Sequence, residues 1–178
     1  MEKLRQSLID ALEEGQLKLG YREEAVRLYY PLASLNTLLG LSADRAGMHA
    51  ALLAFARAQR DFFGEIAVSH KGDRFCLTIP PRGVARVHEQ VDEHGFLAQF
   101  LQAVSRHGAT MDDVLPAFRR YSDRVIVRAL RGGEFDHLIY FEDGVPNAYY
   151  YCIAEEPCHL TYHRFTREDY EAFGFEEA

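Results

Sequence analysis

The chain has 178 residues, of which 48% are hydrophobic and 26% charged, and its net charge is −7. A chain of this length is expected to bury about two thirds of the surface that its unfolded form exposes, so a structural metal ion or disulfide is not required. The composition is typical of a globular protein and disfavours disorder, and the negative charge disfavours binding to nucleic acid. We therefore expect one globular domain over residues 1–178.

The sequence predicts a cytoplasmic protein without membrane association. The N-terminal segment lacks the apolar stretch of a secretory signal, and no run approaches the 18 apolar residues of a spanning helix. The cysteines Cys76, Cys152 and Cys158 are odd in number and unevenly placed. This usage is typical of a reducing compartment, where a free cysteine behaves as a small hydrophobic residue.

The first sixty residues are predicted to be mainly helical. Leucines recur every four residues from Leu4 to Leu12 beside charged neighbours, which indicates an amphipathic helix. A second helix is predicted over residues 22–39, with a kink or a restart at Pro31, because proline removes a backbone donor and crowds the preceding turn. Ser42 is a good N-cap for a third helix.

The pattern then changes to the two-residue period of strands. Residues 66–79 predict a β-hairpin with its turn at residues 71–73. Helical periodicity returns over residues 83–106, with a break at residues 94–95. The pair Thr110 and Asp113 has the spacing of a capping box and predicts the start of another short helix.

The rest of the chain is predicted to consist of strands and one terminal helix. The breaks between the strands are short, which requires antiparallel neighbours. Thr166 and Asp169 again have capping-box spacing, and Gly174 is a natural stop for the terminal helix. We therefore expect an α+β fold, with an N-terminal helical half packed on one antiparallel sheet of about five or six strands and a short C-terminal helix. The predicted strands cover residues 124–130, 137–142, 148–153 and 158–165.

A metal site near Cys158 is not predicted, although Cys158, His159 and His163 lie within six residues and Cys152 is close upstream. On a strand, His159 and His163 lie about 13 Å apart and Cys158 points to the opposite face. One tetrahedral zinc ion cannot bridge that separation. The sequence also lacks the common nucleotide-binding, hydrolase and metalloprotease motifs. We expect no cofactor, and the pattern favours a protein that is not an enzyme.

Arginine is concentrated around residues 119–131 of an otherwise acidic chain. If the strands near residues 74, 124–130 and 158–165 share a sheet, their polar positions face the same way and form a surface for an acidic ligand. The alternative is a solvated sheet face whose arginines pair with local carboxylates. The predicted ligand-binding residues are Arg74, Arg124, Arg128, Tyr149, Tyr151, His159 and His163.

The leading functional hypothesis is a non-enzymatic binding protein that uses this polar face to bind a protein partner or a small anionic ligand. One alternative is an enzyme of unfamiliar type that acts on a small anionic substrate, with His159 or His163 as general base. Another alternative is a structural homodimer formed through the aromatic face of the sheet.

Two segments carry a resemblance to known sequences. They run from Gly20-Tyr21-Arg22 to Tyr29-Tyr30-Pro31-Leu32, and from Phe165 to Tyr170. In these segments the chain resembles an uncharacterised bacterial protein family with no established function. The resemblance implies no site residues.

Overall fold

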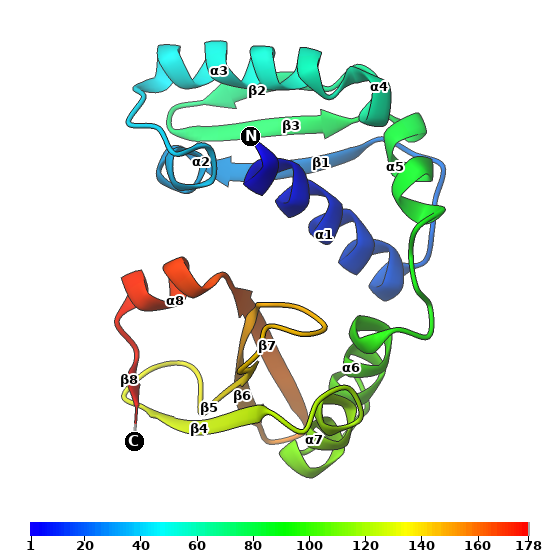
Figure 1. Ribbon diagram of the computed structural model, residues 1–178, viewed down its shortest axis with the longest axis vertical. Coiled ribbons are helices and arrows are strands. Elements are labelled where there is room, and N and C mark those ends of the chain that lie inside the picture. The colour runs from blue at the N-terminus through cyan, green and yellow to red at the C-terminus, as the bar shows by residue number, and fades with distance from the viewer. Residues whose placement is uncertain (178) are drawn as a thin grey trace. The chain divides into compact units, whose positions relative to one another are not determined.

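The computed structural model describes residues 1–177 and divides the chain into two compact units, residues 1–92 and 93–178. Each unit has an antiparallel sheet and helices of its own (Figure 1). The α+β class is confirmed, but the prediction of a single sheet of five or six strands is wrong, and helices are not confined to the N-terminal half. That the whole chain forms one domain stays a prediction.

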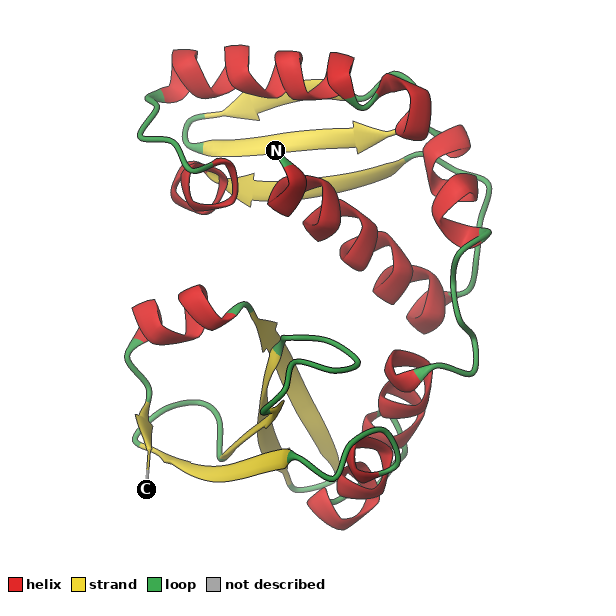
Figure 2. Cartoon of the chain, in the orientation of Figure 1, coloured by secondary structure: helices red, strands yellow, loops and turns green. Residues whose placement is uncertain are grey.

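The first unit is built from five helices and three strands, which Figure 2 distinguishes by colour. Its elements are α1 (Glu2–Leu19), β1 (Val26–Pro31), α2 (Leu32–Leu39), α3 (Arg45–Ala58), α4 (Arg60–Phe63), β2 (Ala67–Lys71), β3 (Arg74–Ile79) and α5 (Pro81–His88). The predicted hairpin is confirmed as β2 and β3, and Gly72 turns between them at a φ of 60°. The third helix begins two residues later than predicted, because Asp44 rather than Ser42 caps it.

The predicted helix over residues 22–39 is wrong in its first half. Residues 26–31 form β1, which pairs with β3, so the order of the first sheet is β1-β3-β2 (Figure 1). The restart at Pro31 is confirmed, because α2 begins at the next residue. This segment forms a strand because Leu28 and Tyr30 alternate with exposed neighbours and pack against the core.

The core of the first unit lies between one face of this sheet and the helices. The sheet contributes Phe75, Leu77 and Ile79, which β3 directs to the same side. Helices α1 and α3 contribute apolar stripes at the helical spacing, which include the fully buried Leu8 and Phe55. One face of the sheet is therefore covered, and the opposite face carries the alternate residues of each strand.

The second unit is built from three helices and a sheet of four long strands, extended by a two-residue strand. The antiparallel order β7-β6-β5-β4-β8 confirms the predicted C-terminal strands. The elements are α6 (Phe96–Val104), α7 (Met111–Arg119), β4 (Val125–Arg131), β5 (His137–Phe141), β6 (Tyr150–Glu156), β7 (His159–Phe165), α8 (Arg167–Phe173) and β8 (Glu176–Glu177).

Both faces of the second sheet carry apolar clusters. On one face, Phe100 and Phe118 of the helices α6 and α7 meet Tyr151, with ring centroids 4.9 and 5.2 Å from that of Tyr151. On the other face, Leu138 and Cys152 belong to a cluster that also includes side chains from α8 and the segment after it. This second layer explains why strands β5 and β6 are buried over most of their length.

Two predicted helix starts are confirmed. Asp113 accepts hydrogen bonds from the backbone N–H and the hydroxyl of Thr110, at 3.0 and 3.1 Å. Thr166 accepts a hydrogen bond from the backbone N–H of Asp169, at 3.1 Å. Each cap satisfies a backbone or side-chain group at the first turn of its helix, which fixes where α7 and α8 begin.

Candidate binding surface

The arginine and histidine positions predicted on the second sheet share one face but do not come together. The register aligns Arg128, Leu138, Cys152 and His163 in one row across β4, β5, β6 and β7. Three strand spacings therefore separate Arg128 from His163, or roughly 14 Å. The two strands in between carry apolar side chains at these positions, so this row does not form a continuous polar surface.

The remaining predicted positions of the second unit are also dispersed. Arg124 forms an ion pair of 3.4 Å with Glu142, as the alternative of a solvated face with local pairs suggested. His159 is exposed at the start of β7. The guanidinium of Arg164 lies over the ring of Tyr149, 4.9 Å from its centroid.

Tyr151 lies on the opposite face of the second sheet and is fully buried against α6 and α7. Its hydroxyl donates a hydrogen bond of 3.3 Å to the side chain of Asn147. Its ring is therefore part of the core and is not available to a ligand on the surface.

Arg74 belongs to the other sheet. The expectation that its strand joins those of Arg124 and His159 in one sheet is wrong, because β3 pairs with β1 and β2. The physical reason is that β1 supplies the edge partner that the hairpin needs, from a segment predicted to be helical. Arg74 therefore belongs to a different candidate surface.

That surface is the uncovered face of the first sheet, which we call the open face. It consists of the residues that alternate with the core positions of the three strands. The register places them in three rows: Arg27, Thr78 and Ala67; Tyr29, Cys76 and Ser69; and Pro31, Arg74 and Lys71.

The open face is basic, in contrast to the acidic chain as a whole. Three of its nine positions are cationic, Arg27, Lys71 and Arg74, and none carries a carboxylate. All three side chains are exposed, and within residues 1–177 none of the three forms an ion pair. Arg45 and Arg60, elsewhere in this unit, instead pair with Asp73 and Glu65.

The centre of the open face is organised by one aromatic ring. The guanidinium carbon of Arg74 lies 4.8 Å from the ring centroid of Tyr29, which is 51% exposed. A guanidinium over an aromatic ring is attracted to its face and keeps its N–H donors for other partners. The side chains of Cys76 and Ser69, in the same row as Tyr29, are small, so the sheet surface beside Arg74 and Tyr29 lies lower than the two large side chains. The arrangement presents fixed donors to a carboxylate.

A cysteine and a histidine are neighbours in the second sheet, a pairing that no sequence pattern predicted. Cys152 and His163 are register partners on β6 and β7, with Cβ atoms about 5 Å apart. Burial raises the pKa of the Cys152 thiol to about 12. The thiol therefore stays protonated at neutral pH, which disfavours a role as a nucleophile.

Metal-ligand clusters and membrane-spanning helices are both absent from the described chain, residues 1–177. Within residues 1–177, no three or more histidine, cysteine, aspartate or glutamate side chains come together in a way that suits a metal ion. In the same part of the chain, no helix has the length and the apolar character that crossing a membrane requires.

Arg27 and Lys71 were not predicted as members of a candidate surface. The signal for Arg27 was the two-residue alternation of residues 26–31, in which Arg27 and Tyr29 take the same phase. The signal for Lys71 was weaker, because it lies at the end of a strand whose outer face is small and polar. Finding the surface also required the pairing of β1 with β3, which joins segments about fifty residues apart.

Comparison with known proteins supports the resemblance noted from the sequence. No curated protein and no solved structure matches the chain. A family model described as a domain of unknown function, with E. rectale in its description, matches residues 1–174. The prediction of an uncharacterised bacterial family is therefore confirmed, and the chain belongs to the family DUF3877.

Proposed function

We propose that this protein is a non-enzymatic cytoplasmic binding protein that takes a short acidic segment of a partner protein on the open face. The observation that carries the proposal is the set of three exposed cations, Arg27, Lys71 and Arg74, that form no ion pair within residues 1–177. Two other arginines of the same unit, Arg45 and Arg60, are paired with carboxylates. Three unneutralised cations on one face favour an external anion.

The size of the face supports a peptide segment rather than a large globular partner. Three rows of outward residues span roughly 13 Å along the strands, and three strands span roughly 10 Å across. A stable interface between globular proteins buries about 800 Å² on each partner, which is considerably more than this face offers. A segment of a few residues fits it.

The chemistry of the face supports carboxylates as the groups bound. Arg74 is held by the ring of Tyr29, so its fork loses less conformational freedom on binding than a mobile arginine would. Arg27 and Lys71 lie in the outer rows of the face and extend the positive potential in both directions along the sheet. Because these charges are exposed, salt weakens the binding.

The proposal is tested by fluorescence anisotropy of a labelled oligoglutamate peptide, with oligoglutamine of the same length as the neutral control. We expect the full-length protein to bind the acidic peptide at low salt and to bind the neutral peptide far more weakly. The double variant Arg27→Glu, Arg74→Glu loses about tenfold or more in affinity, because each hydrogen bond to a charged group contributes about 1.5–3 kcal/mol.

The matched control is Arg57→Glu, Arg82→Glu. Both arginines are exposed on helices of the same unit and neither belongs to the open face, so this variant has the same net charge as the test variant. Equal losses in the two variants would mean that only the net charge matters. That result, or equal binding of the acidic and neutral peptides, would refute the proposal.

The two other hypotheses stay predictions. An enzyme with His159 or His163 as general base requires a pocket beside either residue, and a homodimer requires an exposed aromatic face. Tyr151 does not contribute to such a face because it is buried. Turnover of a small anionic substrate that is lost in His163→Gln would support the first hypothesis, and a dimer mass at micromolar concentration the second.

A further inference from the structure

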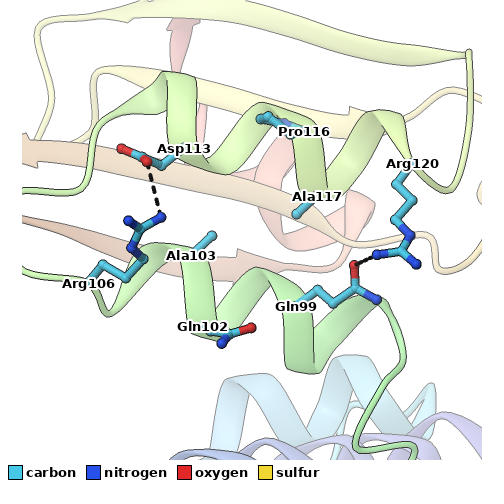
Figure 3. Close-up of a pocket in the computed structure, with 8 residues that line it drawn as sticks. All are labelled: Gln99, Gln102, Ala103, Arg106, Asp113, Pro116, Ala117 and Arg120. Carbon is cyan, nitrogen blue, oxygen red and sulfur yellow. Dashed lines mark hydrogen bonds and ion pairs between the residues drawn. The ribbon is translucent and has the colours of Figure 1, made fainter.

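A groove that is open to solvent runs between α6 and α7 in the second unit (Figure 3), and its volume is about 580 Å³. Its walls use the same helical spacing on both sides, i, i+3, i+4 and i+7. On α6 and just beyond it these positions are Gln99, Gln102, Ala103 and Arg106, and on α7 and just beyond it they are Asp113, Pro116, Ala117 and Arg120. The aromatic residues of both helices point the other way, into the core.

Each end of the groove is closed by one arginine that reaches across to the other helix. At one end, Arg106 lies 3.3 Å from a carboxylate oxygen of Asp113. At the other end, Arg120 donates a hydrogen bond of 3.2 Å to the side-chain oxygen of Gln99. Between the two ends, the side chains of Ala103 and Ala117 leave a low floor (Figure 3). Seven residues of helix separate the two ends, or about 10 Å.

Arg106 is not needed by its carboxylate partner. Asp113 already accepts two hydrogen bonds from Thr110, at 3.0 and 3.1 Å, and these bonds lower the pKa of its carboxyl. The ion pair itself is exposed, with 67% of the Arg106 side chain accessible, and exposed pairs contribute little stability. Arg106 can therefore turn to a ligand while Asp113 keeps the partners that hold it at the start of α7.

Arg120 is similarly available to a ligand. Its partner is a neutral amide, and that amide of Gln99 also donates to the hydroxyl of Tyr121 and to the carbonyl of His94, both at 2.7 Å. These bonds hold Gln99 in place without Arg120. The guanidinium keeps most of its five donors for an anion, because a single amide oxygen accepts from one of its nitrogens.

We propose that this groove binds an elongated small molecule that carries an anionic group at each end, a carboxylate or a phosphate. The two guanidinium groups bind the two ends, and the floor between them accommodates an uncharged spacer. Its volume lies within the range of about 300–1,000 Å³ that is usual for small-molecule sites. The inference is independent of the acidic-peptide proposal, because the groove and the open face belong to different units.

Isothermal titration calorimetry of the full-length protein tests this inference. The probes are α,ω-dicarboxylates from succinate to suberate, with the monocarboxylate octanoate as the control for length, and tripolyphosphate as the phosphate arm. We expect a longer dianion to bind about tenfold or more tightly than octanoate, since a second charge-assisted contact is gained. Preference for dicarboxylate or polyphosphate identifies the anionic group.

Variants then assign the binding to the groove. Arg106→Gln and Arg120→Gln each remove one charged end and weaken the dianion about tenfold. Ala117→Leu fills the floor without changing charge and also weakens it. Arg119→Gln, on an exposed position of α7 outside the groove, leaves the affinity unchanged. Thermal unfolding confirms that each variant is folded.

Three results would overturn the inference. One is the absence of binding for every dianion tested. Another is equal affinity for suberate and octanoate. The third is an equal loss in Arg119→Gln and in Arg106→Gln, which would indicate a general response to charge. Loss of oligoglutamate binding in the open-face variants has no bearing on these outcomes.

Discussion

The packing of α5 against α4 and β3 depends on the absence of a side chain at Gly83. A Cβ atom at this position would lie 2.5 Å from the carbonyl oxygen of Phe63, 2.8 Å from Cγ2 of Ile79 and 3.0 Å from Cα of Phe63. Real Cβ contacts are essentially never this short, and a backbone oxygen cannot rotate away. Gly83→Ala therefore forces a shift of the backbone at this junction.

The magnitude follows from two opposing effects. Overpacking in a well-packed site costs about 1–3 kcal/mol, and replacing glycine by alanine in a helix contributes up to about 1 kcal/mol. Because the closest contact is to backbone, we place the cost near the upper end, which leaves a net loss of about 1–2 kcal/mol. For a chain of this size the melting temperature falls by roughly 2–8 °C.

Gly15 provides the matched control within the same unit. It lies in α1, and a Cβ atom there would meet nothing within 4 Å. Gly15→Ala therefore stabilises the fold by about 0.5–1 kcal/mol, through helix propensity alone. The assay is thermal unfolding followed by circular dichroism, with urea unfolding as a second measure. If Gly83→Ala were as stable as the wild type or more stable, the packing argument would be refuted.

Other predictions concern pH, thiols and cooperativity. Hydrogen bonds from Thr110 lower the pKa of Asp113, so its stabilisation is present above the unfolded value of about 3.9 and is lost as the pH falls through the lower folded pKa. Asp113→Asn therefore lowers the melting temperature at pH 7, and its difference in melting temperature from the wild type becomes smaller below about pH 4. A difference that does not depend on pH would contradict this prediction. Asp112→Asn is the control. Exposed Cys158 reacts rapidly with iodoacetamide, whereas buried Cys152, whose pKa is raised to about 12, reacts only after unfolding; mass spectrometry after brief labelling checks this, and equal labelling of both would contradict it. The prediction of one domain implies a single calorimetric unfolding transition, and two resolved transitions would show that the units unfold separately.

The elements that the sequence predicted correctly are those with strong local signals. The capping pair Thr110 and Asp113 and the pair Thr166 and Asp169 fixed two helix starts, because both partners of each pair lie within four residues. The C-terminal strands were readable because turn residues separate them. These features need no knowledge of distant segments.

The strand β1 was missed because its six residues satisfy two periods at once. Leu28 falls on a helical stripe with Leu32 and Leu35, and it also alternates with Arg27 and Tyr29 as a strand does. The choice depends on β3, about fifty residues away, which no local pattern reveals. The same long-range pairing places Arg74 in the first sheet, so the open face could not be predicted from local sequence patterns.

The phase of the polar positions on β4 and β7 was predictable, but their separation was not. Arg128 and His163 do face the same side of one sheet, as the two-residue alternation implied. In the sheet, β5 and β6 lie between them. On this face β5 and β6 carry apolar side chains, which pack against α8 and the segment after it. Strand order is set by the packing of the whole unit rather than by any one segment.

The most direct test of the central claim is to map the acidic-peptide site by NMR. In a ¹⁵N-labelled full-length protein titrated with oligoglutamate, we expect the largest amide shifts at residues 26–30, 67–71 and 74–79, and we expect salt to abolish them. Shifts that are confined to the second unit, or that are equally large with oligoglutamine, would contradict binding at the open face.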